Sequence, residues 1–103
     1  MRDLRWYTDP GHGWLRVPLQ AVIDAGVAER ISSCSYIATA HPGGLNATAQ
    51  PTAYLEEDCD APAFLAAAGI SHDTAASFPT THQDGQSFIR RLPSFSFTEG
   101  GQE

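Results

Sequence analysis

Two segments of the sequence carry side chains whose types and spacing could do chemistry. In the first, Asp9 and His12 lie three residues apart in a polar segment, and an Asp–His pair can orient a general base. A reaction would also need a nucleophile or a metal, and the sequence contains neither a Gly-x-Ser-x-Gly nor a His-Glu-x-x-His motif. We therefore expect Asp9 and His12 to stabilise a turn, and we assign no catalytic residue.

The second segment holds four carboxylates within five residues, at Glu56, Glu57, Asp58 and Asp60. Carboxylate oxygens bind Mg²⁺ and Ca²⁺, but the spacing does not match the Asp-x-Asp-x-Asp-Gly pattern of a calcium loop. The cluster is thus expected to cap a helix and to face solvent, or to bind a partner, and we assign no metal-binding or cofactor-binding residue.

The two cysteines, Cys34 and Cys59, are too few for a disulfide scaffold. A zinc site could combine these cysteines with His41, His72 or His82. However, the sequence contains no Cys-x-x-Cys pair and no His-x₃-His pair, which are the spacings typical of such a site. We expect both thiols to be reduced and partly buried.

A hairpin should position the first segment. Apolar and polar residues alternate on both sides of Asp9-Pro10-Gly11, which has the chemistry of a tight turn with a positive φ at Gly11. Pro18 fits the first position of a helix that ends at Gly26. A second helix, capped by Asp58 or Asp60, has Pro62 in its first turn and ends at Gly69.

The remaining periodicity predicts strands and loops. Strands are expected at 4–8, 14–17, 32–39, 53–57 and 87–92, with the third and fourth as antiparallel neighbours, and loops at 40–52 and 71–86. The predicted fold is one compact α+β domain over residues 1–93, with four or five short, mainly antiparallel strands and two helices packed on one face. Residues 94–103 are expected to form a flexible C-terminal tail, in which Phe95 and Phe97 could pack locally.

Charge is unevenly distributed along the chain, whose formal net charge is −6. Between Arg30 and Arg90 there is no Lys or Arg, so the negative charge is concentrated in the middle of the sequence. Such a field disfavours nucleic acid and favours a basic protein surface, although a modest acidic excess also serves solubility alone. No apolar run is long enough for a membrane span, and a cytoplasmic location is the default expectation.

Three stretches resemble a family of small uncharacterised proteins encoded by bacterial phages, plasmids and other mobile elements. They are Trp6-Tyr7-x-Asp9-Pro10-Gly11-His12-Gly13-Trp14-Leu15-x-Val17, Ser32-Ser33-x-Ser35-Tyr36, and Tyr54-Leu55-Glu56-Glu57-Asp58-Cys59-Asp60 followed by Phe64. The resemblance implies a genomic setting and transfers no catalytic residue. The segment from Ala40 to Thr52 is longer and richer in Gly and Pro than the family's pattern. By analogy, small acidic mobile-element proteins include inhibitors of host defence such as anti-CRISPR proteins.

These observations lead to three hypotheses. The first is a non-enzymatic acidic module that binds a basic protein surface, for instance the nucleic-acid groove of a CRISPR effector. The second is a small metal-dependent or hydrolytic enzyme that uses Asp9, His12 and the Glu56–Asp60 cluster, which a pocket joining His12 to the cluster would favour. The third is an accessory or structural phage protein. We favour the first, with these partner-binding residues: Glu56, Glu57, Asp58, Asp60, Tyr36 and Tyr54, and with Phe78 as a further candidate anchor.

Overall fold

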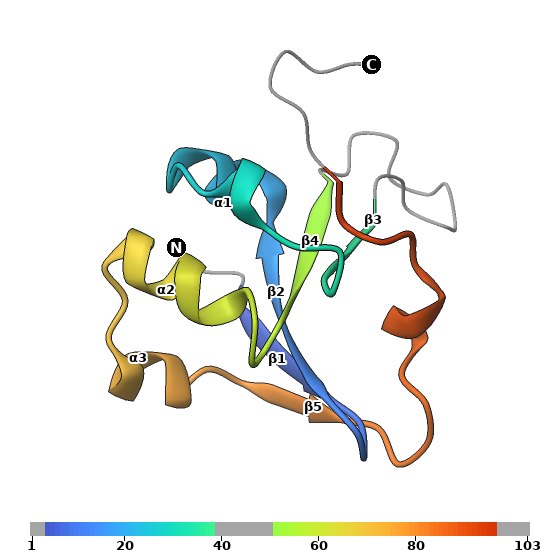
Figure 1. Cartoon of the computed structure of the whole chain (residues 1–103). Helices are drawn as coiled ribbons and strands as arrows, with labels where there is room; N and C mark the ends of the chain where they lie inside the picture. The colour runs from blue at the N-terminus through green and yellow to red at the C-terminus, as the bar shows by residue number, and fades with distance from the viewer. Residues whose placement is uncertain (1–3, 39–50, 97–103) are drawn as a thin grey trace.

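A five-stranded sheet with strand order β3-β4-β2-β1-β5 forms the centre of the fold (Figure 1). The computed structural model describes residues 4–38 and 51–96. The strands are β1 (Arg5–Thr8), β2 (Gly13–Pro18), β3 (Tyr36–Ala38), β4 (Thr52–Glu56) and β5 (Thr80–His82). The helices are α1 (Leu19–Asp24), α2 (Ala61–Ala68) and α3 (His72–Ala76), with two 3₁₀ helices, η1 (Ala28–Arg30) and η2 (Phe88–Arg91).

The sheet is mainly antiparallel. The predicted hairpin is confirmed, since β1 pairs with β2 in a register that places Trp6 opposite Leu15. The predicted pairing of the third and fourth strands is also confirmed, by β3 and β4, while β5 alone runs parallel to its neighbour β1. The α+β prediction therefore holds, with a mixed sheet.

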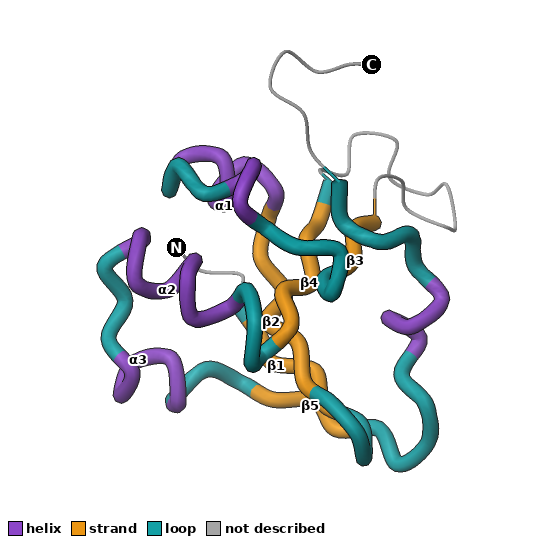
Figure 2. The backbone as a smooth tube through the Cα atoms, in the orientation of Figure 1, coloured by secondary structure: helices purple, strands orange, loops and turns teal. Residues whose placement is uncertain are grey.

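The two faces of the sheet bury different side chains. Leu15 and Leu55 are fully buried on the face covered by α1 and α2, where they pack with Val22 and Phe64 of those helices. The three α-helices lie on one side of the sheet in Figure 2, and η2 lies on the other. On the η2 side, a smaller cluster consists of Trp14, Tyr54 and Ile89.

Both predicted helix stops are correct. Gly26 and Gly69 have positive φ values of 80° and 74°, which glycine adopts without steric cost, and each follows the end of a helix. Gly11 does not have a positive φ, so that prediction is wrong. A Cβ at Gly11 would lie 3.0 Å from Nη2 of Arg90, so glycine there allows close approach of a side chain.

Pro18 was expected inside the first helix, but it is the last residue of β2 and α1 begins at Leu19. The segment 71–86 is not one loop, because it contains α3 and β5. Ser71 caps α3 by accepting a hydrogen bond from the Thr74 N–H at 3.1 Å. The three residues of β5 are all exposed on the sheet edge, so no alternation of apolar residues marked this strand.

Residues 87–92 form the 3₁₀ helix η2 instead of a strand. Ser87 caps this helix through its hydroxyl, which accepts from the Ile89 N–H at 3.2 Å. Of the described part of the predicted strand at 32–39, residues 36–38 form β3, and 33–35 form a turn and a bend instead. Phe95 is buried in the core, and residues 97–103 and 40–50 lie outside the described residues.

Within residues 4–38 and 51–96, no helix is long and apolar enough to cross a membrane.

Candidate functional site

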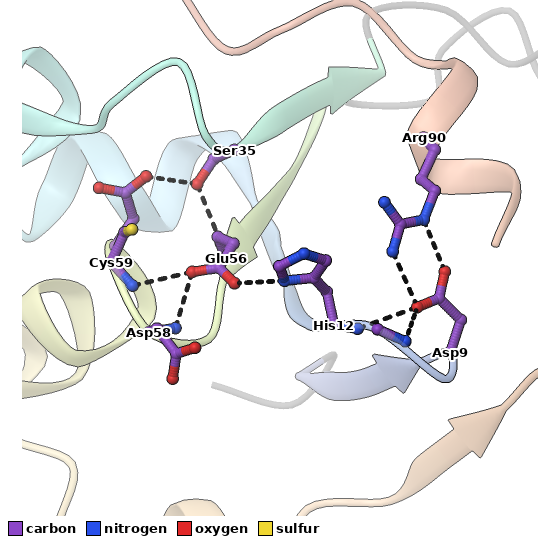
Figure 3. Close-up of polar contacts among 9 residues, drawn as sticks. Asp9, His12, Ser35, Glu56, Asp58, Cys59 and Arg90 are labelled. Carbon is purple, nitrogen blue, oxygen red and sulfur yellow. Dashed lines mark hydrogen bonds and ion pairs between the residues drawn. The ribbon is translucent and has the colours of Figure 1, made fainter. Parts of the chain in front are cut away.

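The hairpin turn is organised by Asp9, whose side chain is almost completely buried. Its Oδ1 accepts hydrogen bonds from the backbone N–H groups of Gly11 and His12, both at 3.0 Å (Figure 3). Its Oδ2 accepts from the Arg90 Nε–H at 2.8 Å and from the Ser87 N–H at 3.0 Å. The Arg90 guanidinium holds the pKa of the Asp9 carboxyl far below its ordinary value, although burial opposes this. Asp9 therefore joins the turn to η2, as a structural group.

The imidazole of His12 contacts the acidic cluster. Its Nδ1 lies 3.2 Å from Oε2 of Glu56, and the His12 side chain is half exposed. This contact brings together the two segments that the sequence singled out, because β2 and β4 are neighbours and place Trp14 opposite Glu56. A half-exposed imidazole oriented by a buried carboxylate can act as a general base.

Two of the four acidic residues of the cluster, Glu56 and Asp60, are buried. Glu56 Oε1 accepts hydrogen bonds from the N–H groups of Asp58 and Cys59, at 2.8 and 2.9 Å. Asp60 accepts from the Ser32 hydroxyl at 2.7 Å and from the Ser35 hydroxyl at 2.5 Å. Both residues are buried, so their expected place on an exposed binding surface is corrected. Their local role is to satisfy donors of two adjoining turns.

The other two acidic residues, Glu57 and Asp58, are exposed. Partial desolvation raises the pKa of the Glu57 carboxyl, and the nearby charges of Asp58 and Glu56 raise it further. Its carboxylate lies over the start of β2, since a Cβ on Gly13 would be 2.6 Å from Glu57 Oε1. Glu57 thus carries a charge that its surroundings disfavour.

The aromatic residues that were expected to anchor a partner differ in their exposure. Tyr54 is buried against Tyr7 and Phe88, so it does not offer a free surface. Tyr36 is half-buried and packs edge-on against Trp14, with ring centroids 6.3 Å apart. Phe78 packs against the larger core cluster.

A polar cleft of about 330 Å³ opens on the η2 side of the sheet. Its lining residues are His12, Trp14, Cys34, Tyr36, Glu56, Asp58, Cys59 and Arg90. The Arg90 guanidinium lies over the Trp14 ring, 5.3 Å from its centroid. Within the described residues, Trp14 Nε1 is the buried side-chain polar atom that lacks a hydrogen-bond partner.

Both cysteines are exposed, which corrects the expectation of partial burial. They come from different segments of the chain, but both line the polar cleft. The neighbouring Cys34 thiol and the Glu56 carboxylate raise the pKa of the Cys59 thiol to about 11. In the described part of the chain, no three His, Cys, Asp or Glu side chains converge as a metal site.

An apolar groove of about 390 Å³ lies on the side of α2 and α3. It is lined by Trp6, Glu57, Ala61, Pro62, Leu65, Ala66, Ile70, His72, Ala75 and Ala76, with no Lys or Arg among them. The indole N–H of Trp6 donates to the Ala75 carbonyl oxygen at 2.8 Å, which fixes α3 against β1.

The sequence reasoning did not identify this groove. One signal was available, because every residue of α2 is apolar, so the helix has apolar surface beyond the stripe that packs on the sheet. The partner of that surface, α3, lies in a segment that was expected to be a loop.

Comparison of the chain with models of protein families, with curated proteins and with solved structures found no match.

Proposed function

We propose that the protein is a non-enzymatic protein-binding module, and that its apolar groove takes a partner segment with an apolar side chain next to a Lys or Arg. The observation that carries this proposal is the position of Glu57. Glu57 lines the groove, the pKa of its carboxyl is raised by partial desolvation, and no lining residue is Lys or Arg. A cation from a partner would offset the cost of keeping that carboxylate ionised.

The groove supplies the apolar part of such an interface. Leu65 and Ile70 are partly buried, and together with Trp6 they leave an apolar depression large enough for one or two side chains. Interface energy is concentrated in a few anchors that enter pockets of this kind, whereas charges at the rim contribute mainly to specificity and association rate.

The acidic middle of the chain supports a basic partner. Glu57, Asp58, Asp73 and Asp84 are all exposed, and all lie in the segment without Lys or Arg between Arg30 and Arg90. A nucleic-acid-binding groove is one basic protein surface of this kind. Because of this and of the resemblance to mobile-element proteins, we further propose that the protein inhibits a host defence complex, for example a CRISPR effector, in the bacterial cytoplasm.

A matched pair of variants on α2 tests the proposal. Ala66 and Ala67 are neighbouring exposed residues of this helix, but only Ala66 lines the groove. Ala66→Arg should fill the groove and place a cation beside it, whereas Ala67→Arg adds the same charge and volume elsewhere. In pull-downs from host lysate at low and high salt, we expect Ala66→Arg to lower the capture of the main partner about tenfold or more. Capture should remain for Ala67→Arg and fall with salt for the wild type.

Equal capture by Ala66→Arg, Ala67→Arg and the wild type would contradict the proposal. That outcome would favour an accessory or structural role in which the acidic residues serve solubility.

One observation favours a second candidate, a small enzyme. The polar cleft contains His12 together with Glu56 and Asp58, which is the arrangement that was expected to favour the enzyme hypothesis. Because the pKa of Cys59 is raised to about 11, this thiol is a poor nucleophile near neutral pH, and His12 would act as the base toward water or a bound substrate. Hydrolysis of p-nitrophenyl acetate that falls about a hundredfold in His12→Ala would support an enzyme, whereas equal slow rates would support the binding module.

A further inference from the structure

The turn before β3 and the turn after β4 are held together next to the two cysteines. Cys34 directly precedes Ser35, and Cys59 directly precedes Asp60. The Ser35 hydroxyl donates to Asp60 Oδ2 at 2.5 Å, so the neighbours of the two cysteines are in direct contact. The Ser32 N–H also donates to Asp60, at 3.1 Å to Oδ1.

The Ser35 hydroxyl connects the same turns a second time, because it accepts a hydrogen bond from the Glu56 N–H at 2.9 Å (Figure 3). All of these groups belong to buried residues or to the turn itself, so the spacing between the two segments is fixed by the fold. The cysteines are therefore placed by contacts that do not involve their own sulfur atoms.

The two cysteines line the same cleft and are open to solvent. The Ser35–Asp60 hydrogen bond joins the residues that follow them, and the Cys34 thiol is near enough to raise the pKa of the Cys59 thiol. A disulfide requires Cβ atoms that approach closely and side chains that face each other, and two cysteines that line one cleft beside directly bonded neighbours are placed for that approach. An exposed pair of this kind is also accessible to small redox reagents.

We propose that Cys34 and Cys59 form a reversible disulfide by exchange with a low-molecular-weight disulfide of the glutathione class. In the first step, the thiolate of Cys34 attacks one sulfur of the small disulfide, which gives a mixed disulfide on Cys34 and releases one small thiolate. In the second step, the sulfur of Cys59 attacks the Cys34 sulfur and releases the second small thiolate. The protein loses two protons and two electrons, and the small disulfide gains them as two thiols.

The carboxylate of Glu56 serves the second step. Its Oε1 accepts a hydrogen bond from the Cys59 backbone N–H at 2.9 Å, next to the Cys59 thiol, and its Oε2 lies 3.2 Å from the imidazole of His12. It can therefore accept the proton that Cys59 gives up as it attacks, and pass that proton to His12, which is half exposed. The polar cleft thus holds both the thiol pair and its proton acceptor.

Closing the disulfide should stabilise the fold. The bond would close a loop of roughly 25 residues and restrict the unfolded chain, while the native turns already stand in place. For a domain of this size we expect the melting temperature to rise by on the order of 10 °C on oxidation and to return on reduction.

The test uses the full chain in buffers with defined ratios of oxidised to reduced glutathione. Mass spectrometry after alkylation should show that the wild type loses both free thiols and the mass of two hydrogen atoms, without a glutathione adduct. Cys34→Ser and Cys59→Ser should each retain one thiol or carry one glutathione.

A matched control moves one thiol by a single residue. Ser33 is exposed and adjacent to Cys34, so the double variant Ser33→Cys with Cys34→Ser keeps the composition and shifts only the position of the sulfur. It should give glutathione adducts in place of the internal bond. The proposal is overturned if the wild type keeps both thiols, accumulates two adducts or dimers, or melts at a lower temperature once the internal bond forms.

Discussion

The acidic cluster consists of two buried residues, here called the inner residues, and two exposed residues, here called the outer residues. The two pairs differ in what surrounds their carboxylates. Glu56 and Asp60 are buried and accept hydrogen bonds from the backbone and from serine hydroxyls. Glu57 and Asp58 are exposed, and Glu57 lies beside apolar side chains and other negative charges. Residues of the same type, one or two positions apart in sequence, therefore serve the fold in one case and are available for binding in the other. Charge counted along a sequence does not distinguish these cases, because it carries no information on where the donors lie.

Of the substitutions considered, the largest loss of stability is expected at Asp60. Asp60→Ala removes an acceptor used by two hydroxyl groups and a backbone N–H, and leaves those donors without their partner. Unsatisfied buried donors are costly, so we expect the free energy of unfolding to fall by about 3 kcal/mol in urea denaturation. The matched change at the outer position, Asp58→Ala, should cost less than about 0.5 kcal/mol. Similar losses in both variants would remove the distinction between the inner and outer residues.

Asp9 should dominate the acid sensitivity of the fold. Its pKa in the folded state is far below the ordinary value near 4, so its contribution to stability is complete above pH 4 and is lost as the pH falls further. We expect Asp9→Asn to cost about 2 kcal/mol at pH 7 and to flatten the fall in stability below pH 4. The measurement is the melting temperature from pH 2 to pH 7. A variant that retains the wild-type slope would show that other carboxyls carry the acid sensitivity.

The sequence predicted the parts of the fold that have a local signal. Alternation on both sides of Asp9 predicted the hairpin, and Gly26 and Gly69 predicted the ends of α1 and α2. By contrast, β5 has no local signal, because Thr80–His82 are exposed and are extended through pairing with β1. The alternation of side chains at 87–92 predicted a strand. The segment instead contains the 3₁₀ helix η2, and Asp9, which is distant in sequence, accepts hydrogen bonds from the Ser87 N–H and from Arg90.

The candidate site was predictable only in part. The sequence identified His12 and the acidic cluster as chemically interesting, but their contact depends on the pairing of β2 with β4. The meeting of Cys34 with Cys59 depends on contacts of Ser35 that are distant in sequence. Spacing rules for motifs do not include such contacts, so the positions of the two cysteines along the chain did not predict that they share a cleft.

The smallest effect on stability should come from Glu57. The pKa of the Glu57 carboxyl is raised, so the ionised carboxylate is disfavoured in the folded state. Stability is therefore lost as the pH rises from the ordinary pKa of a glutamate to the raised pKa of Glu57. Glu57→Gln removes that charge and should leave the free energy of unfolding at pH 7 unchanged or higher by less than about 0.5 kcal/mol, since the side chain is exposed. Below pH 4 the variant and the wild type should coincide. A clear loss of stability at pH 7 would assign Glu57 to the structural group with Glu56 and Asp60.

The most direct test of the division between structural and binding carboxylates is a peptide-display selection on the apolar groove. The wild type is used as bait, with counter-selection against Ala66→Arg to remove peptides that bind elsewhere. We expect enrichment of peptides with an apolar side chain next to a Lys or Arg, and Glu57→Lys should change the enriched charge to Asp or Glu. No enrichment over Ala66→Arg, or the same basic preference in Glu57→Lys, would contradict the assignment of Glu57 and the groove as the binding site.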